Sequence, residues 1–254
     1  MRVWPPLLLV ALAGCATFYA AQLDQRYGAP DPARYDRPVS AASDYPAVKA
    51  ILDNRCAVCH GCNDAPCQLN LASYQGLTRG ANREQVYATR LRATEPTRLF
   101  FDAQSNAAWR AKGFHPVLNE RAATPEAERE AGVLYRLLQL KRAHPLPAGA
   151  KLPKERFDFS IDRAQQCPAI EGMDEYERKY PDWGMPFGLP ALSQAEHDTL
   201  ARWVEAGAPP PPATPLPAAY AQRVARWEAF LNGDSLKARL ASRYIFEHWF
   251  IGHL

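Results

Sequence analysis

The sequence predicts a mainly α-helical fold with long irregular insertions. Apolar residues recur at helical spacing in several stretches, and residues typical of helix starts precede two of them, at Thr124-Pro125 and at Ser193 to Glu196. The chain also contains 23 prolines, which favour loops and extended connections over a long, regular helical bundle. We therefore expect helices that are separated by long, proline-containing loops.

Composition sets the outer limits of function. With 254 residues, the chain is long enough to form one large domain or two modest ones with a substantial apolar core. Its 30 basic side chains nearly balance its 27 acidic ones, which leaves a formal net charge of +3, and no polybasic run is present. Nucleic acid is therefore not an expected partner.

The N-terminus has the pattern of an export signal. Arg2 precedes an apolar run through Leu12, and small residues follow it. The segment from Leu12 to Cys15 also fits a lipobox, in which Cys15 becomes the lipid-modified first residue of the mature protein. An uncleaved anchor is the alternative, because weakly apolar residues continue to Ala21. We interpret residues 1–21 as a signal or anchor and place the rest of the chain in the bacterial periplasm.

A Cys-x-x-Cys-His motif follows an irregular, proline-containing leader (residues 22–43) and a helix expected from Asp44 to Cys59. This motif is the attachment signature of a c-type haem. One helical turn brings Cys56 and Cys59 to one face, where their sulfurs can form thioethers with the two vinyl groups of a porphyrin. His60 then supplies an imidazole nitrogen as the proximal ligand of the iron. The sequence thus predicts one covalently bound haem c.

The cysteines of this region also allow other metal sites. Cys56, Cys59, Cys62 and Cys67 could hold a structural zinc ion, and their spacing resembles part of an iron–sulfur ferredoxin motif. Export favours the haem, because thioether attachment takes place in the periplasm, where an oxygen-sensitive cluster would be unusual. In that oxidising compartment Cys62 and Cys67 are close enough in sequence to form a disulfide. Cys167 is then left without an obvious partner.

The stretch after the motif is less regular. Leu69 to Leu77 alternates polar and apolar residues and is interpreted as a short extended strap. Asn82 to Ala93 is expected to form a helix. Its arginines are most simply a solvated face, with pairing to haem propionates as the alternative. These arginines are Arg83, Arg90 and Arg92.

A strongly apolar helix is expected after Thr124 and Pro125, which suit the N-cap and the first helical position. His144, near its end and before a proline, is interpreted as a helix-end residue. The apolar face of this helix, which we expect to lie in the core, consists of Val133, Leu134, Leu137, Leu138 and Leu140.

Met185 is the expected second ligand of the haem iron. A thioether sulfur suits haem iron, and in small cytochromes c this methionine lies in a proline-containing loop before the last helix. Here Trp183 to Pro186 precedes a helix that starts with a Ser193–Glu196 capping box and ends at Gly207. Packing of Met185 in a turn is the alternative, since methionine fills gaps. Met173 is a weaker candidate for this ligand, and His115 and His197 are interpreted as surface or core residues rather than ligands.

The order of the haem turn (Cys56 to His60), the methionine loop (Trp183 to Pro186) and the capped helix is that of a cytochrome c. We therefore assign residues 44–207 to a cytochrome c-like haem domain with long loop insertions. The proline-rich residues 208–217 suit a polyproline II linker. Two helices are expected beyond it, from Ala218 to Leu231 and from Leu236 to Leu254. The second is rich in aromatics, and because a domain rarely ends on such an apolar face, we interpret residues 218–254 as the start of a further, truncated domain.

Several segments of the chain together carry a resemblance to a known family. These segments are Cys56 to Cys67, Arg98 to Ser105, Trp109 to Phe114, Arg163 to Pro168 and Trp183 to Pro190. In sequence and order they resemble the bacterial fatty acid cis/trans isomerases, and the resemblance runs from about Tyr45 to the C-terminus. It implies a periplasmic, haem c-containing isomerase, of which this chain covers about the first third.

Two functions from different classes follow. The resemblance implies conversion of free cis-unsaturated fatty acids, released from membrane phospholipids, to the trans form at the membrane surface. The haem held by Cys56, Cys59 and His60 is then the catalyst, because an iron centre can weaken a π bond without a soluble cofactor. The alternative is a monohaem electron carrier with a redox partner. A His60/Met185 pair favours it, because six-coordinate iron leaves no vacant site for a substrate.

Overall fold

The structure is a computed structural model, which describes residues 19–37, 43–61, 65–88, 91–147, 149, 151–160, 163–212 and 217–249. Cys15 and Cys62, to which the sequence assigned lipidation and a disulfide, lie outside these ranges. The chain divides into two compact units, Met1–Pro211 and Pro212–Leu254, and the division falls within the proline-rich stretch. Within the described ranges, no helix has both the length and the apolar character needed to cross a membrane.

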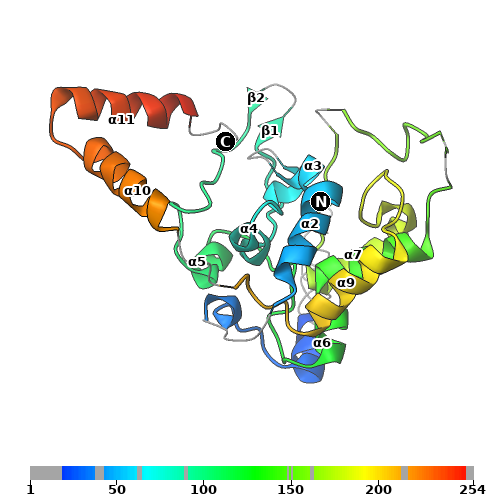
Figure 1. Cartoon of the computed structure of the whole chain (residues 1–254). Coiled ribbons are helices and arrows are strands. Elements are labelled where there is room, and N and C mark those ends of the chain that lie inside the picture. Colours follow the sequence, from blue (N-terminus) through cyan, green and yellow to red (C-terminus); the bar gives the residue numbers. More distant parts are fainter. Residues whose placement is uncertain are drawn as a thin grey trace, which may run out of the picture. The chain divides into compact units, whose positions relative to one another are not determined.

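The first unit is mainly helical, as predicted (Figure 1). Residues 19–27 are helical and precede the others. The α-helices are α2 (Tyr45–Arg55), α3 (Ala57–His60), α4 (Tyr74–Arg79), α5 (Asn106–Ala111), α6 (Pro125–Glu130), α7 (Val133–Ala143), α8 (Met173–Lys179) and α9 (Gln194–Glu205). The short 3₁₀ turns are η1 (Arg34–Asp36), η2 (Pro66–Gln68), η3 (Ile170–Gly172) and η4 (Pro181–Trp183). The strands are β1 (Tyr87–Ala88) and β2 (Leu91–Arg92), which pair antiparallel.

The core of the first unit forms where α9 packs against α2, α6 and α7 (Figure 1). Val48 and Leu52 of α2 are fully buried, and Leu200 and Val204 of α9 are 1% exposed. Burial of each such side chain stabilises the fold by about 1.5–3 kcal/mol relative to exposure. The predicted apolar face of α7 also lies in this core, as its spacing required.

Side-chain caps fix the starts of several helices. The hydroxyls of Ser73, Ser105 and Thr124 accept hydrogen bonds from backbone N–H groups three residues later, at the starts of α4, α5 and α6. Ser193 and Glu196 form the predicted capping box of α9, in which each side chain bonds the backbone of the other. These caps satisfy N–H groups that a helix start otherwise leaves unpaired.

The helix expected from Asn82 to Ala93 is not present. The side chain of Asn82 accepts a hydrogen bond from Glu84 N–H at 2.7 Å, a local turn that competes with helix formation. Val86 is buried, and its carbonyl accepts hydrogen bonds from Ala93 and Thr94, so the segment folds back as the β1–β2 hairpin. The apolar pattern of residues 82–93 alone did not reveal that a turn and a hairpin compete with the helix.

Two further elements differ from the sequence predictions. The expected strap from Leu69 to Leu77 becomes helical from Tyr74, because Ser73 caps α4. The expected single helix after Thr124 is broken into α6 and α7 at Gly132. A Cβ atom on Gly132 would lie 2.9 Å from Glu128 O, so the break needs a residue without a side chain.

The second unit consists of α10 (Ala218–Leu231) and α11 (Leu236–Trp249), which contact each other. Both helices occur where the sequence predicted them, except that residues 250–254 lie outside the described ranges. Ser242 Oγ donates to Leu231 O at 2.6 Å, and Ala238 is buried near the turn between the helices. Most of the large apolar side chains of the pair are exposed.

Candidate functional site

The Cys-x-x-Cys-His motif forms the compact turn that its spacing predicted. Helix α2 ends at Arg55, and Cys56 leads directly into α3. The N–H groups of Cys59 and His60 both donate to Cys56 O, at 3.1 and 2.9 Å. Cys56 and Cys59 therefore lie on one turn, and both are free thiols. Burial raises the pKa of Cys56 to about 11, so its thiol is protonated at neutral pH.

His60 is buried and held in one orientation. Its Nδ1 lies 3.2 Å from Leu69 O, and because a carbonyl only accepts hydrogen bonds, Nδ1 carries the proton. Burial lowers the pKa of His60 to about 4, against the opposing effect of the nearby Leu69 and Pro66 carbonyls. The imidazole is thus neutral, with its lone pair on Nε2. Leu71 N–H donates to His60 O at 2.7 Å, which ties the following strap to the motif.

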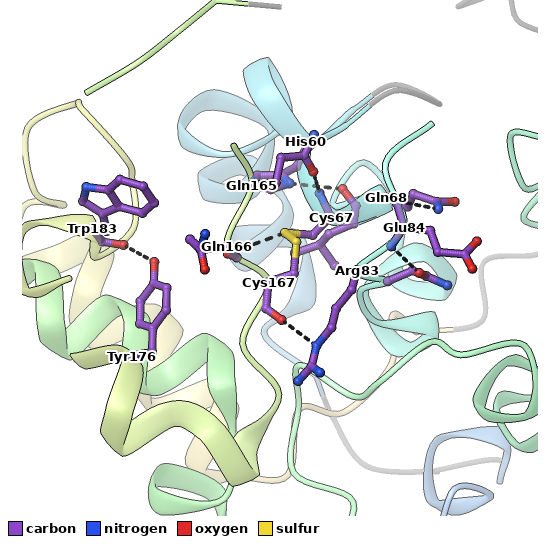
Figure 2. Close-up of a disulfide and its surroundings, with 12 residues drawn as sticks. His60, Cys67, Gln68, Arg83, Glu84, Gln165, Gln166, Cys167, Tyr176 and Trp183 are labelled. Carbon is purple, nitrogen blue, oxygen red and sulfur yellow. Dashed lines mark hydrogen bonds between the residues drawn. A yellow bond between two sulfur atoms is a disulfide. The ribbon is translucent and has the colours of Figure 1, made fainter. Parts of the chain in front are cut away.

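Cys67 forms a disulfide with Cys167, not with Cys62 as the sequence suggested (Figure 2). The partner comes from a segment 100 residues further along the chain. Gln165 Oε1 accepts a hydrogen bond from Cys67 N–H at 2.8 Å, and Arg83 Nε donates to Cys167 O at 3.3 Å (Figure 2). Spacing in sequence could not reveal these contacts, because they arise only when the distant segment folds back.

The disulfide also bears on the alternative metal sites. A zinc ion or an iron–sulfur cluster held by four cysteines would need the Cys67 sulfur as a thiolate, and this sulfur is already bonded to Cys167. Across the described ranges, no three His, Cys, Asp or Glu side chains gather as a metal site would require. The four-cysteine site is therefore incompatible with this structure.

Met185 lies in a loop that packs closely against α7. Its N–H donates to Leu137 O at 3.0 Å, and its side chain packs partly buried against the core. The preceding Gly184 approaches the α7 backbone so closely that a Cβ atom there would lie 2.2 Å from Lys141 N. Met173, the weaker candidate, is fully buried at the start of α8 and fills the core. Ligation of iron by Met185 stays a prediction.

Comparison with family models gave one match. The model described as fatty acid cis/trans isomerase matches residues 94–254, which is more than half of the chain. The chain belongs to the fatty acid cis/trans isomerase family. Comparisons with curated proteins and with solved structures found no match. The part of this isomerase-family chain that matches includes the Met185 loop, α9 and the second unit, and it begins after the Cys-x-x-Cys-His motif.

The haem turn of this isomerase-family chain has the features that covalent haem attachment needs. Two unbonded thiols share one turn, and a buried neutral imidazole follows them directly. In ligating histidines the second ring nitrogen usually donates to a carbonyl or carboxylate, as Nδ1 of His60 does to Leu69 O. The residues present therefore fit a haem c, while its attachment stays a prediction.

The remaining histidine candidates of the isomerase-family chain have structural roles. The backbone of His115 pairs with Ala81, and burial lowers the pKa of its side chain to about 4. His197 is buried in α9, and its two ring nitrogens lie 3.1 Å from side-chain nitrogens of Gln139 and Arg142. His144 caps the C-terminus of α7, as predicted. Of the three arginines suggested for propionates, the side chains of Arg90 and Arg92 lie outside the described parts.

Sequence reasoning missed Arg79, which is 4% exposed at the end of α4. Its guanidinium donates to Gln68 O at 2.5 Å and to Thr97 Oγ1 at 3.1 Å. The same group lies over the rings of Trp109 and Phe114, 5.3 and 4.7 Å from their centroids. A single arginine in a six-residue helix carries no signal of such a role, because its partners come from three other segments.

Proposed function

We propose that this chain uses a covalently bound haem c to convert cis-unsaturated fatty acids into their trans isomers in the cell envelope. The match of residues 94–254 to the isomerase family carries this proposal. The two free thiols of one turn and the neutral imidazole beside them support the haem. The alternative zinc and iron–sulfur sites both need Cys67 as a thiolate, and Cys67 is bonded to Cys167 instead.

The residues of the haem turn would have separate tasks. Cys56 and Cys59 anchor the porphyrin through two thioether bonds, while His60 presents Nε2 to the iron and Leu69 O holds its Nδ1. When bound, haem supplies the electronic chemistry that weakens a carbon–carbon π bond without a soluble cofactor. The hydrogen bond from Leu71 N–H to His60 O keeps the strap closed against this turn.

We place this activity in the periplasm, with the chain held at the membrane by a lipid on Cys15 or by an uncleaved N-terminal anchor. The signal-like residues 1–21 support this location. The substrates would be free unsaturated fatty acids released from membrane phospholipids. The exposed aromatic side chains of α10 and α11, such as Trp227 and Trp249, are of the type that enters a membrane interface, which supports the membrane surface as a partner.

The second candidate function is a monohaem electron carrier that serves a redox partner. The anchoring of the Met185 loop to α7 favours it, because a methionine whose backbone is held in place suits a permanent sixth ligand of the iron. In that case, isomerisation would require release of Met185 or electron transfer without binding of the alkene to the iron.

Covalent haem staining of the denatured, exported chain tests the cofactor. We expect the wild-type chain to stain and a Cys59→Ser variant to lose covalent haem, because one thioether bond and the attachment motif are removed. A Cys62→Ser variant serves as the control, since it removes a cysteine that neither the Cys-x-x-Cys-His motif nor the Cys67–Cys167 disulfide uses. A Cys59→Ser chain that stained as strongly as wild type would refute the haem site.

Conversion of a cis-monounsaturated fatty acid, followed by gas chromatography, tests the activity. We expect the haem-loaded chain to form the trans isomer, and the Cys59→Ser variant to form none. A Met185→Ala variant should lose any weak absorption band of a thioether-to-iron bond. A stained chain that carries this band and yields no trans product would favour the electron carrier over the isomerase.

A further inference from the structure

A cleft of about 510 Å³ lies in the first unit, away from the residues of the haem turn, and it is open to solvent on one side. Its volume falls within the range of about 300–1,000 Å³ that small-molecule sites occupy. The walls come from η1, from α4, from α5 with the segment before it, and from the prolines that follow α9. Aromatic rings line much of it, namely Tyr35, Tyr74, Phe100 and Trp109.

Several polar groups of these walls are already bonded within the fold. Tyr35 donates its hydroxyl to Asn119 O at 2.8 Å, and Tyr74 donates its hydroxyl to Ala208 O at 3.0 Å. The amide of Asn106 donates to Asp36 at 2.9 Å. Because these donors are engaged elsewhere, the tyrosines offer ring faces to the cleft. The cleft therefore presents both apolar and polar surface, which suits an amphipathic ligand, one with an apolar chain and a polar head.

Two exposed side chains, Phe100 and Arg37, also line the cleft and add one aromatic ring and one cation to it. Phe100 lines the cleft, yet 60% of its surface is exposed, so a ligand there would shield it from water. Arg37 also lines the cleft. Its side chain is 65% exposed, and among the described residues its ion-pair partner is the half-exposed Asp31, at 2.6 Å. An exposed pair of this kind contributes little free energy, so a carboxylate of a ligand can replace Asp31.

We propose that this cleft binds the acyl chain of a free fatty acid, with the carboxylate at Arg37. The assignment of the ligand rests on the proposed function, and it adds a substrate site to it. Helix α4 links the cleft to the haem turn. Tyr74 and Thr78 of α4 line the cleft. The next residue, Arg79, donates to the backbone carbonyl of Gln68, and Gln68 directly follows Cys67 of the disulfide.

Binding of cis-parinaric acid to the full chain, followed by its fluorescence and by competition with oleic acid, tests the site. Phe100→Asp places a charge in the mouth and should weaken binding about tenfold or more, the order expected when the burial of an aromatic side chain is lost. Phe101→Asp is the matched control, because Phe101 is also exposed, at 67%, and lies outside the cleft. It should leave binding within about twofold of wild type.

A third variant tests the position of the carboxylate. Arg37→Gln should raise the dissociation constants of both cis-parinaric acid and oleic acid and leave that of oleyl alcohol, obtained from its competition with the probe, unchanged, since only the two acids are charged. Equal effects of Phe100→Asp and Phe101→Asp, or fluorescence that oleic acid does not compete away, would overturn the proposal. Saturable binding that Phe100→Asp removes, in a chain that forms no trans product, would support the cleft and reject the isomerase. Isomerisation with binding unaffected by Phe100→Asp would reject the cleft alone.

Discussion

Arg79 joins several parts of the first unit through one buried guanidinium. Its hydrogen bonds reach η2 and the segment after β2, and its flat surface lies over Trp109 and Phe114. Burial lowers the pKa of Arg79 to about 10, so the group keeps its charge at neutral pH. The partners that the structure describes for it are neutral oxygens and aromatic rings. Such a position needs the planar, weakly hydrated cation of arginine, which lysine does not provide.

An Arg79→Lys variant should therefore lower the free energy of unfolding by about 1–3 kcal/mol, because the compact ammonium group lacks the planar surface that lies over both rings and the separate nitrogens that reach Gln68 O and Thr97 Oγ1. Urea denaturation of the purified chain measures this loss. Arg83→Lys is the matched control, since Arg83 is exposed and donates a single hydrogen bond to Cys167 O. It should change the free energy of unfolding by less than about 0.5 kcal/mol. Equal losses in the two variants would contradict this account of Arg79.

For single residues, the sequence predicted the arrangement of those side chains whose partners are adjacent in the sequence. Cys56, Cys59 and His60 come together within one turn, so their spacing was sufficient to predict their arrangement. Arg79 and Cys67 depend on partners from distant segments, and the sequence around each of these two residues does not predict those partners. The orientation of His60 by Leu69 O was also hidden, because it depends on the path of the chain after the motif.

Among the elements, α9 was predicted from its own capping residues, whereas the Ser73 and Ser105 caps of α4 and α5 were missed. The capping box of α9 is formed by Ser193 and Glu196 alone, so its signal is complete within four residues. The segment from Asn82 to Ala93 had an apolar pattern that suited a helix, and the local turn at Asn82 and the burial of Val86 prevailed instead. The break at Gly132 was equally hidden, because it depends on how closely the backbone passes Glu128 O.

Helix α9 allows a direct test of its cap. Ser193→Ala removes the oxygen that accepts from Glu196 N–H, and it should lower the free energy of unfolding of the first unit by about 1 kcal/mol. Thermal unfolding followed by circular dichroism detects this change. Thr199→Ala in the middle of the same helix is the control, because the exposed Thr199 hydroxyl bonds only Ala195 O of its own helix. If Thr199→Ala cost as much as Ser193→Ala, the cap would not be what stabilises the start of α9.

For the molecule as a whole, the disulfide is the covalent link between two distant parts of the first unit. It joins Cys67, beside the haem turn, to Cys167, just before η3 and α8, and so closes a loop of 100 residues. Helices α4, α5, α6 and α7 and the β1–β2 hairpin lie inside this loop. A cross-link over such a length removes much conformational freedom from the unfolded chain. The sequence could not predict this pairing, since several pairings were open and only the tertiary fold brings the two Cα atoms to 5.6 Å.

Removal of this link should destabilise the first unit more than any single helix cap does. A Cys67→Ser/Cys167→Ser variant should lose about 2–5 kcal/mol of unfolding free energy, in the range expected for a loop of this length. Urea denaturation with and without a reducing agent measures it, and reduction should bring the wild-type chain to the stability of the variant while leaving the variant unchanged. The second unit lies outside the loop, so α10 and α11 should unfold alike in both chains. A variant as stable as the oxidised wild type would show that hydrogen bonds such as those of Gln165 and Arg83 hold the distant segment without the covalent link.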